Sequence, residues 1–182
     1  MRGREQKWIR AVLHHNSQEA ANELVAAYYD EIYVYIYRQV GNKEDAMDLT
    51  QEGFIAMLQS LPRYNPKLAG FRTWLYHIVS HKVIDARRKA RDRICSLDGM
   101  DIEPEERGDF AEAMADRELL KDIEGYVSCF DPAVQEIYRL HLYGGQSFPK
   151  ISKAVGQPEA KIKAQYYRLL QKIRKEFQGY GI

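Results

Sequence analysis

Three residues with metal-binding side chains, His77, His81 and Asp85, follow one another at intervals of four in a segment of helical pattern. Such intervals place side chains on one face of a helix, and two histidines so spaced are typical of a zinc site. The metallohydrolase form of this motif also has a glutamate after its first histidine, but Ile78 stands there. Lys82 adds a positive charge that would repel a cation. We therefore expect no metal ion at this face.

The sequence shows no other pattern that indicates catalysis. It contains no pairing of a nucleophile with a base and no glycine-rich loop that could hold a phosphate. Cys95 and Cys129 are too few and too isolated for a disulfide framework or a zinc ribbon. We expect a protein that is not an enzyme, binds no cofactor and keeps its thiols free.

No segment of the sequence resembles a signal peptide or a membrane span. Residues 1–7 lack the apolar run of a secretory signal, and no apolar stretch approaches the length that crosses a bilayer. With 29% charged and 45% hydrophobic residues, the composition is that of an ordinary soluble protein. We expect a cytoplasmic protein without membrane insertion.

The C-terminal part of the sequence contains a marked turn between two helical segments. A short helical pattern runs from Phe148 to Val155, and Gly156 ends it. Pro158 suits the first position of a second helix, because proline lacks the N–H that would be unpaired there. A short helix, a glycine turn and a longer basic helix are the components of a helix-turn-helix.

The two sides of this second helix differ in chemistry. One side is an apolar stripe at helical spacing that should face a core, formed by Ile162, Tyr166, Leu169, Ile173 and Phe177. The other side carries cations and an amide, which neutralise phosphates and bond to base edges. A charged face in solvent is the alternative, but the preceding turn favours DNA binding. The residues expected to contact duplex DNA are Lys161, Lys163, Ala164, Tyr167, Arg168, Gln171, Arg174 and Lys175.

Charge is segregated along the chain, although the formal net charge is only +1. Cations dominate from Lys82 to Arg93, and acidic residues dominate from Ser96 to Asp116. The acidic segment has few large apolar residues, which is typical of a flexible linker. We predict an N-terminal domain over residues 1–94, an acidic linker over residues 95–116 and a C-terminal domain over residues 117–182.

Helical patterns account for most of the remaining sequence. The residues from Ser17 to Val40 are predicted to form one helix, with Ser17 as a cap and Gly41 as a stop. The run Ile32–Tyr37 has high strand propensity, but no turn separates it from the helical residues before it. Further helices are expected over residues 44–61, 71–93, 112–130 and 133–143. The predicted fold class is all-α, with two small helical domains joined by a flexible acidic linker, the C-terminal one a helix-turn-helix.

One of these helices carries a polar stripe. Asp48, Gln51, Glu52 and Ile55 are spaced so that they share one side of the helix. Such a stripe could simply face solvent. The run Asp48-Leu49-Thr50-Gln51-Glu52-Gly53-Phe54 also resembles the core-polymerase-binding helix of bacterial RNA polymerase sigma factors. The resemblance implies that the stripe binds core RNA polymerase.

The resemblance extends over nearly all of the chain and in the expected order. Phe71-Arg72-Thr73-Trp74-Leu75, followed by Asp85-Ala86-Arg87-Arg88, is similar to the promoter-melting helix of that family. The turn between Gly145 and Gly156 is similar to its upstream-promoter helix-turn-helix. The two-domain spacing resembles the small extracytoplasmic-function type. The resemblance implies a transcription initiation factor that joins core polymerase, recognises the minus-35 duplex with its C-terminal domain and opens minus-10 DNA with its N-terminal domain.

The start of the melting helix could hold a separated base. Phe71, Arg72 and Trp74 follow a loop that contains proline and glycine, and a loop beside aromatic rings can stack single-stranded bases. An isolated tryptophan such as Trp74 is more often a core residue. The residues expected to contact minus-10 DNA are Asn65, Phe71, Arg72, Trp74, His77, His81, Lys82 and Arg88.

The partners implied by the resemblance are core RNA polymerase and promoter DNA, with an anti-sigma factor as a further partner that the family allows. Gln157, Ala164 and Gln165 differ from the residues usual in the family, and so does Pro149, so the promoter sequence stays open. The alternative function is a helix-turn-helix transcriptional regulator that acts without docking on polymerase. Binding to core polymerase discriminates the two functions.

Overall fold

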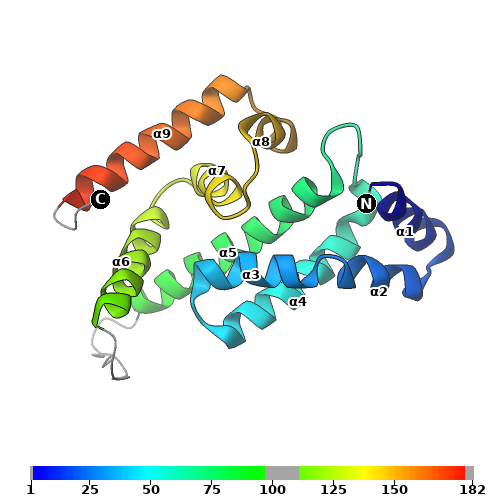
Figure 1. Ribbon diagram of the computed structural model, residues 1–182, viewed down its shortest axis with the longest axis horizontal. Coiled ribbons are helices and arrows are strands. Elements are labelled where there is room, and N and C mark those ends of the chain that lie inside the picture. The colour runs from blue at the N-terminus through cyan, green and yellow to red at the C-terminus, as the bar shows by residue number, and fades with distance from the viewer. Residues whose placement is uncertain (1, 97–110, 179–182) are drawn as a thin grey trace.

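The structure of the protein is a computed structural model that describes residues 2–96 and 111–178. Within these residues the chain is helical and contains no β-strand, which confirms the predicted all-α class (Figure 1). We call α1 to α5 the N-terminal half and α6 to α9 the C-terminal half. None of the described helices has an apolar stretch long enough to cross a membrane.

The elements of the N-terminal half are α1 (Arg2–His15), α2 (Gln18–Ala26), α3 (Tyr29–Val40), α4 (Lys43–Ser60), the 3-10 turn η1 (Leu61–Arg63) and α5 (Phe71–Ser96). Those of the C-terminal half are α6 (Ala111–Val127), α7 (Pro132–Leu142), α8 (Phe148–Val155) and α9 (Glu159–Glu176). The predicted linker over residues 95–116 lies largely outside the described residues. At its two ends, residues 95–96 belong to α5 and residues 111–116 to α6.

Local signals begin and end several helices. The Ser17 hydroxyl accepts a hydrogen bond from the Ala20 N–H at 3.2 Å, and the Asp131 carboxylate accepts one from the Ala133 N–H at 2.8 Å. Both are side-chain caps, and the one at Ser17 is the cap that the sequence predicted. Gly41 and Gly156 end α3 and α8 in the left-handed conformation, with φ of 71° and 68°. A side chain would be strained at either position.

Two sequence-based boundaries were wrong. The predicted helix from Ser17 to Val40 is two helices, because the backbone leaves the helical path at Tyr28, where φ is −124°. The Tyr28 ring is buried against Phe71 with ring centroids 5.4 Å apart, so tertiary packing overrides the local helical preference. Pro158 precedes α9 as its cap residue instead of occupying its first turn.

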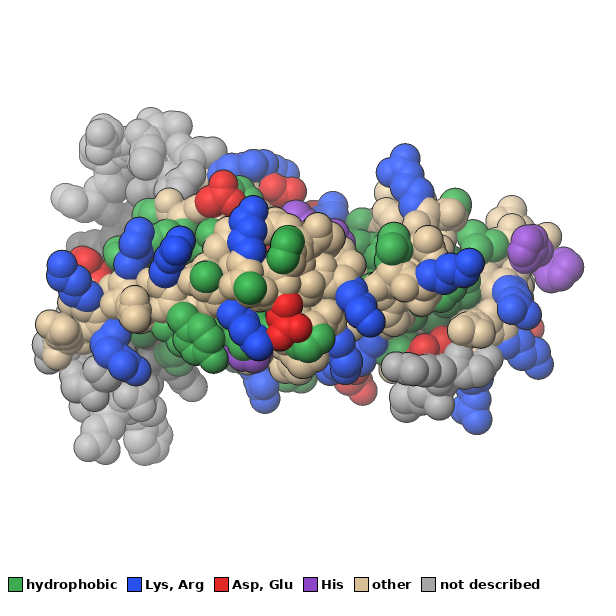
Figure 2. Space-filling model, turned by 90° about the horizontal axis from the view of Figure 1, so that it is seen from above, with side chains coloured by type: hydrophobic (Ala, Val, Ile, Leu, Met, Phe, Trp, Pro, Cys, Tyr) green, Lys and Arg blue, Asp and Glu red, His purple; other side chains and the backbone are tan. Residues whose placement is uncertain are grey.

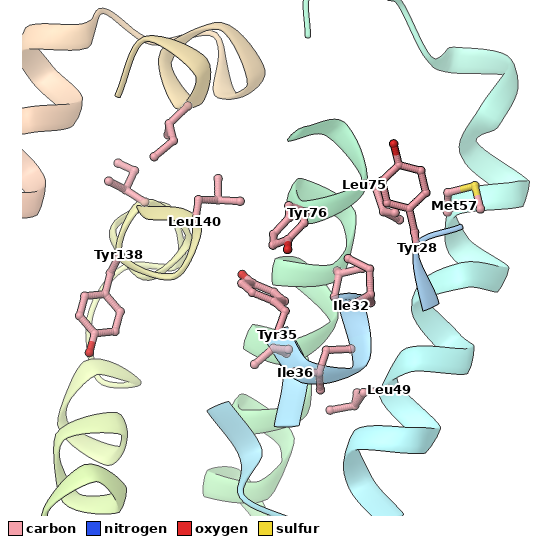
Figure 3. Close-up of a cluster of buried hydrophobic side chains, with 14 of the residues drawn as sticks. Tyr28, Ile32, Tyr35, Ile36, Leu49, Met57, Leu75, Tyr76, Tyr138 and Leu140 are labelled. Carbon is pink, nitrogen blue, oxygen red and sulfur yellow. The ribbon is translucent and has the colours of Figure 1, made fainter. Parts of the chain in front are cut away.

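The two halves share one apolar core. α5 lies at the centre, with α3 and α4 packed on one side and α7 and α8 on the other (Figure 1). Figure 3 shows that Leu140 on α7 points towards α5, which carries Leu75 and Tyr76. The strand-prone residues Ile32 and Ile36 are helical and buried in the same core. Residues 135–140 of α7 are all buried, because this helix packs against both α5 and α9.

Candidate nucleic-acid interfaces

The predicted polar stripe of α4 lies on the surface of the N-terminal half. Asp48, Gln51, Glu52 and Ile55 are all exposed, and Ile55 keeps 56% of its surface accessible. The opposite side of α4 enters the core through Leu49, Thr50, Gly53, Phe54 and Met57. We call the four exposed residues the α4 surface. An exposed branched apolar side chain between carboxylates and an amide is suited to a protein partner.

The α4 surface lies beside the predicted melting helix, α5. A Cβ added to Gly53 would lie 3.1 Å from Val79 Cγ2, so the glycine lets α4 approach α5 closely. Lys82 Nζ lies 3.4 Å from Glu52 Oε2, which links the two helices at the surface. Arg88, farther along α5, is exposed and pairs with Asp85 at 2.9 Å. Both cations remain accessible to an anionic partner.

Arg72 is fixed at the start of α5 by polar contacts with α3. Its Nε donates to Glu31 Oε1 at 2.5 Å, and the Tyr76 hydroxyl donates to the same oxygen at 2.5 Å. Burial lowers the pKa of Arg72, but its bonds to Glu31 and Tyr76 outweigh burial and raise the pKa above its usual value. Burial and the Glu31 carboxylate both raise the pKa of Tyr76. Arg72 is therefore held in one orientation at the N-terminal end of α5.

An aromatic cluster lies between the loop after η1 and α5. The half-buried Trp74 ring packs on Tyr64 and Phe71, with centroid distances of 5.0 Å and 5.7 Å. Phe71 is only 3% exposed, so the expectation that its ring contacts DNA does not fit the structure; it supports Trp74 from the core side. Asn65 is exposed in the loop, where its side chain accepts a hydrogen bond from the Lys67 N–H at 3.0 Å.

Helix α7 packs beside the face of α5 that bears the half-buried His77 and the exposed His81. The His77 imidazole is hydrogen-bonded to the Glu136 carboxylate, and His81 Nε2 lies 3.4 Å from the same group. His77 is half-buried and His81 is exposed, so their contact with DNA stays a prediction, with the Glu136 carboxylate of the C-terminal half beside both rings. The bond to Glu136 raises the pKa of His81. Burial raises the pKa of Glu136, but the bonds from His77 and His81 outweigh burial and hold it below its usual range.

A second polar contact between the halves is completely buried. Arg139 on α7 is 0% exposed, and its Nη1 donates to Glu124 at 2.7 Å and to the Gln39 side-chain oxygen at 2.9 Å. Arg87 on α5 lies 3.4 Å from Glu124 and also donates to the Gln39 carbonyl. Burial lowers the pKa of Arg87. No local pattern in the sequence indicates this network, because its residues lie far apart in the chain.

The helix-turn-helix is formed by α8 and α9, as predicted. All five residues of the predicted apolar stripe of α9 are buried, and the eight residues predicted to contact duplex DNA are exposed, apart from the half-buried Ala164. Tyr167 is 54% exposed. Lys163 Nζ pairs with Glu159 at 2.7 Å, one helical turn earlier. The basic face of α9 is therefore accessible over its whole length.

An aromatic cluster fixes the angle between α8 and the helices around it. The Phe148 ring stacks on His141 with centroids 4.1 Å apart, and Tyr166 meets the His141 ring edge-on at 4.7 Å. Figure 2 views the molecule from the side of α8 and α9 and shows many Lys and Arg side chains across that face, with few acidic ones. A rigid, cation-rich helix face is suited to the phosphates of a duplex.

Comparisons with known proteins agree with this arrangement. Residues 24–93 match the family described as Sigma-70 region 2. The chain is 30% identical over 155 residues to the ECF RNA polymerase sigma factor SigE of Mycolicibacterium smegmatis, covering 84% of this chain and 60% of the relative. It is 28% identical over 160 residues to the ECF RNA polymerase sigma factor BldN of Streptomyces coelicolor, covering 85% and 59%. The chain thus spans about three fifths of the length of these two relatives.

Two solved structures have the same fold. The structure of CnrH in complex with the cytosolic domain of CnrY aligns with a TM-score of 0.61 at 19% identity, covering 98% of this chain and 97% of that one. The sigma factor RpoE in complex with the anti-sigma factor NepR, from Bartonella quintana, aligns with a TM-score of 0.54 at 15% identity, covering 86% and 96%. The chain is also 31% identical over 159 residues to the ECF RNA polymerase sigma factor SigD of Mycobacterium tuberculosis, covering 81% of this chain and 72% of SigD. This identity, over most of the length of SigD, shows that the chain belongs to the ECF family of RNA polymerase sigma factors.

Proposed function

We propose that the chain is a transcription initiation factor that binds core RNA polymerase and directs it to specific promoters. The observation that carries this proposal is the α4 surface, where Asp48, Gln51, Glu52 and Ile55 are exposed together on a helix whose other side is packed. A duplex-binding regulator that acts alone has no need of an acidic and apolar surface at this position, because acidic side chains are repelled by the negatively charged DNA. The α4 surface is proposed to dock on core polymerase.

The basic face of α9 is proposed to read the minus-35 duplex. Arg168 and Gln171 can bond to base edges, and the surrounding lysines can neutralise phosphates. The exposed Tyr167 and the half-buried Ala164 supply apolar contact in the same face. Support comes from the exposure of this face and from the buried stripe on the opposite side of α9.

Minus-10 DNA is proposed to bind along α5, from its start to about Arg88, and along the loop before it. Asn65, Arg72, Trp74, Lys82 and Arg88 are at least partly accessible there. A stacking platform and neighbouring cations are what single-stranded DNA requires. The exposed His81 can join this surface as it stands, whereas the half-buried His77 joins it fully only after α7 moves away, because its ring is bonded to Glu136.

A protein that holds the factor inactive is proposed as a third partner. The solved RpoE structure contains the anti-sigma factor NepR, and the CnrH structure contains the cytosolic domain of CnrY. By analogy, this chain is proposed to bind a protein of the anti-sigma class. That protein would occupy the surfaces that bind polymerase and would therefore compete with polymerase.

Reversal of charge at Glu52 tests the proposal. The Glu52→Lys variant should lose retention on immobilised core polymerase and lose promoter-specific transcription, while its helical content stays unchanged. Glu52 is exposed, and its contact with Lys82 is a surface ion pair, so the substitution should cost little stability. Glu23→Lys reverses a second exposed carboxylate, on α2, and serves as the matched control.

The same experiment also distinguishes the proposed function from the alternative function. A helix-turn-helix regulator without polymerase docking would bind duplex DNA equally well with Glu52→Lys and would show no retention of the wild-type chain on core polymerase. Equal retention of wild type and the Glu52 variant would remove the α4 surface from the polymerase interface.

A further inference from the structure

Three side chains that can ligate a metal meet where α5 packs on α7. His77 and His81 of α5 and Glu136 of α7 place their ligand atoms within 4.8 Å of one another. His81 Nε2 lies 3.4 Å from Glu136 Oε2, and His77 Nδ1 is hydrogen-bonded to Glu136 Oε1. The two imidazole rings lie edge to face with centroids 4.8 Å apart. The cluster thus draws two ligands from one half of the chain and one ligand from the other.

The charge of the cluster favours a cation. The Glu136 side chain is only 6% exposed, and a buried carboxylate needs a compensating positive charge. Neutral imidazoles donate hydrogen bonds but carry no charge, so either a protonated imidazole or a bound cation must supply it. A divalent ion between the carboxylate and the two ring nitrogens would supply the charge and keep both imidazoles in the neutral form that metals bind.

The geometry suits a tetrahedral ion. Zinc bonds to histidine nitrogen and carboxylate oxygen at about 2.0–2.2 Å, which places two of its ligands roughly 3.4 Å apart in a tetrahedral site. The His81–Glu136 separation already has this value. His77 lies closer to Glu136, and its partly exposed ring can turn to admit the ion. His81 is 49% exposed, which leaves an open side for water as the fourth ligand.

The two charged residues next to the cluster on α5 form ion pairs with residues outside the cluster. Lys82, whose charge argued against a metal in the sequence, lies 3.4 Å from Glu52 on α4. Asp85, the third residue of the sequence pattern, pairs with Arg88 at 2.9 Å. The third ligand is instead Glu136, a residue 59 positions from His77. The expectation of no metal rested on residues that do not form this cluster.

We propose that His77, His81 and Glu136 bind a transition-metal ion of the zinc class, with water completing the coordination, and that the ion ties the two halves of the chain together. A ligand set with two imidazoles suits zinc and nickel and disfavours magnesium, which prefers oxygen ligands alone. The proposal that these residues bind a metal does not depend on the proposed function. Its consequence rests on that function: the ion would hold α7 over the part of α5 that opens promoter DNA.

Calorimetric titration of the chelator-treated full chain with Zn²⁺, Ni²⁺ and Mg²⁺ tests the site. One Zn²⁺ or Ni²⁺ per chain should bind, and Mg²⁺ should not. His77→Gln and His81→Gln should each weaken Zn²⁺ binding by at least about tenfold, since each removes one of three protein ligands. His14→Gln/His15→Gln, a double variant that removes two exposed histidines of α1, should bind as the wild type does.

Amide hydrogen exchange tests the connection between the halves. Zn²⁺ should slow exchange in both the α5 segment around His81 and the α7 segment around Glu136. In Glu136→Gln the protection of α7 should disappear, and circular dichroism would show whether each variant keeps its helices. Equal Zn²⁺ affinity of wild type and the His77 and His81 variants, loss of binding in the His14/His15 control, or no binding at all would overturn the proposal.

Neither assay contains polymerase or DNA. A failure to bind Zn²⁺ therefore leaves the proposed transcriptional function standing, and a failure to bind core polymerase leaves the metal site standing.

Discussion

Gly144, after the C-terminal end of α7, rests directly on the ring of Tyr76 in α5. A Cβ at Gly144 would lie 2.8 Å from Tyr76 Cδ1 and 2.8 Å from the Leu140 carbonyl oxygen. Tyr76 cannot move aside freely, because its hydroxyl donates to Glu31 at 2.5 Å. The missing side chain therefore sets how closely the two halves approach each other.

The substitution Gly144→Ala should destabilise the chain by about 1–3 kcal/mol, because an added methyl group must displace backbone and a held ring. Urea unfolding followed by circular dichroism measures the change. Gly125→Ala provides the control, since Gly125 lies in α6 with open space around it. That variant should gain about 0.5–1 kcal/mol from the better helix former. An unchanged stability of Gly144→Ala would show that the halves are not pressed together at this point.

Removal of the Trp74 ring should separate polymerase binding from strand opening. Trp74→Ala should still bind core polymerase and form a closed complex, but it should lose about 1–3 kcal/mol of open-complex stability if the ring stacks on a separated base. Permanganate reactivity of minus-10 thymines reports the opening, and a template with a pre-melted bubble should restore transcription.

The other tryptophan of the chain, Trp8 on α1, gives the matched control for this experiment. Trp8→Ala should lower stability without a selective loss of strand opening. Loss of polymerase binding or of helicity in Trp74→Ala would assign Trp74 to the core alone, together with its neighbours Tyr64 and Phe71.

The recognition helix offers a test of base reading. Arg168→Ala should cost about 1–3 kcal/mol of promoter affinity and relax the preference at one base pair, if Arg168 bonds to a base edge. Selection from a randomised minus-35 library measures the preference. Lys172→Ala serves as the control on the same helix, because Lys172 Nζ lies over the Phe130 ring at 5.0 Å and Lys172 is not among the residues predicted to contact the duplex. An unchanged preference would restrict Arg168 to phosphate contact.

Alkaline pH should destabilise the core through its buried tyrosines. Burial raises the pKa of Tyr35 from 10.0 to about 12. Because the folded state favours the neutral ring, the contribution of Tyr35 to stability is complete below pH 10 and is lost as pH rises from 10 towards 12. Burial also raises the pKa values of Tyr28, Tyr76, Tyr138 and Tyr143.

Urea unfolding at a series of pH values above neutrality measures this loss. Tyr35→Phe gives up the hydrogen bond of 2.6 Å between the Tyr35 and Ser80 hydroxyls, so it should be less stable near neutral pH. It should then lose stability less steeply than the wild type above pH 10. Parallel curves for the two proteins would mean that Tyr35 does not titrate in this range.

The elements that follow from local rules could be predicted from the sequence. Ser17 and Asp131 cap helices through bonds to residues three and two positions away, and Gly156 ends α8 by its own backbone conformation. The stripe from Ile162 to Phe177 has the helical period, so its burial also follows from spacing. Such features depend on residues within one or two turns.

The contacts between the halves depend on residues far apart in the chain and could not be predicted in this way. Glu136 meets His77 across 59 positions, and Arg139 meets Gln39 across 100 positions. The periodic pattern of apolar residues in the sequence does not indicate such long-range pairs. The break at Tyr28 was missed for a related reason, since the packing of its ring on Phe71 outweighs a continuous helical pattern.

The buried Arg139 network determines where the molecule can come apart. Arg139 and Glu124 belong to the same half and bond to each other at 2.7 Å, so their charges remain neutralised when the halves separate. Within this network the bonds that break are the one from the Arg139 guanidinium to the Gln39 amide oxygen and the longer ion pair of Arg87 with Glu124, and water can replace both. The halves thus separate between Arg139 and Gln39, and the Arg139–Glu124 ion pair stays intact within the C-terminal half when they do.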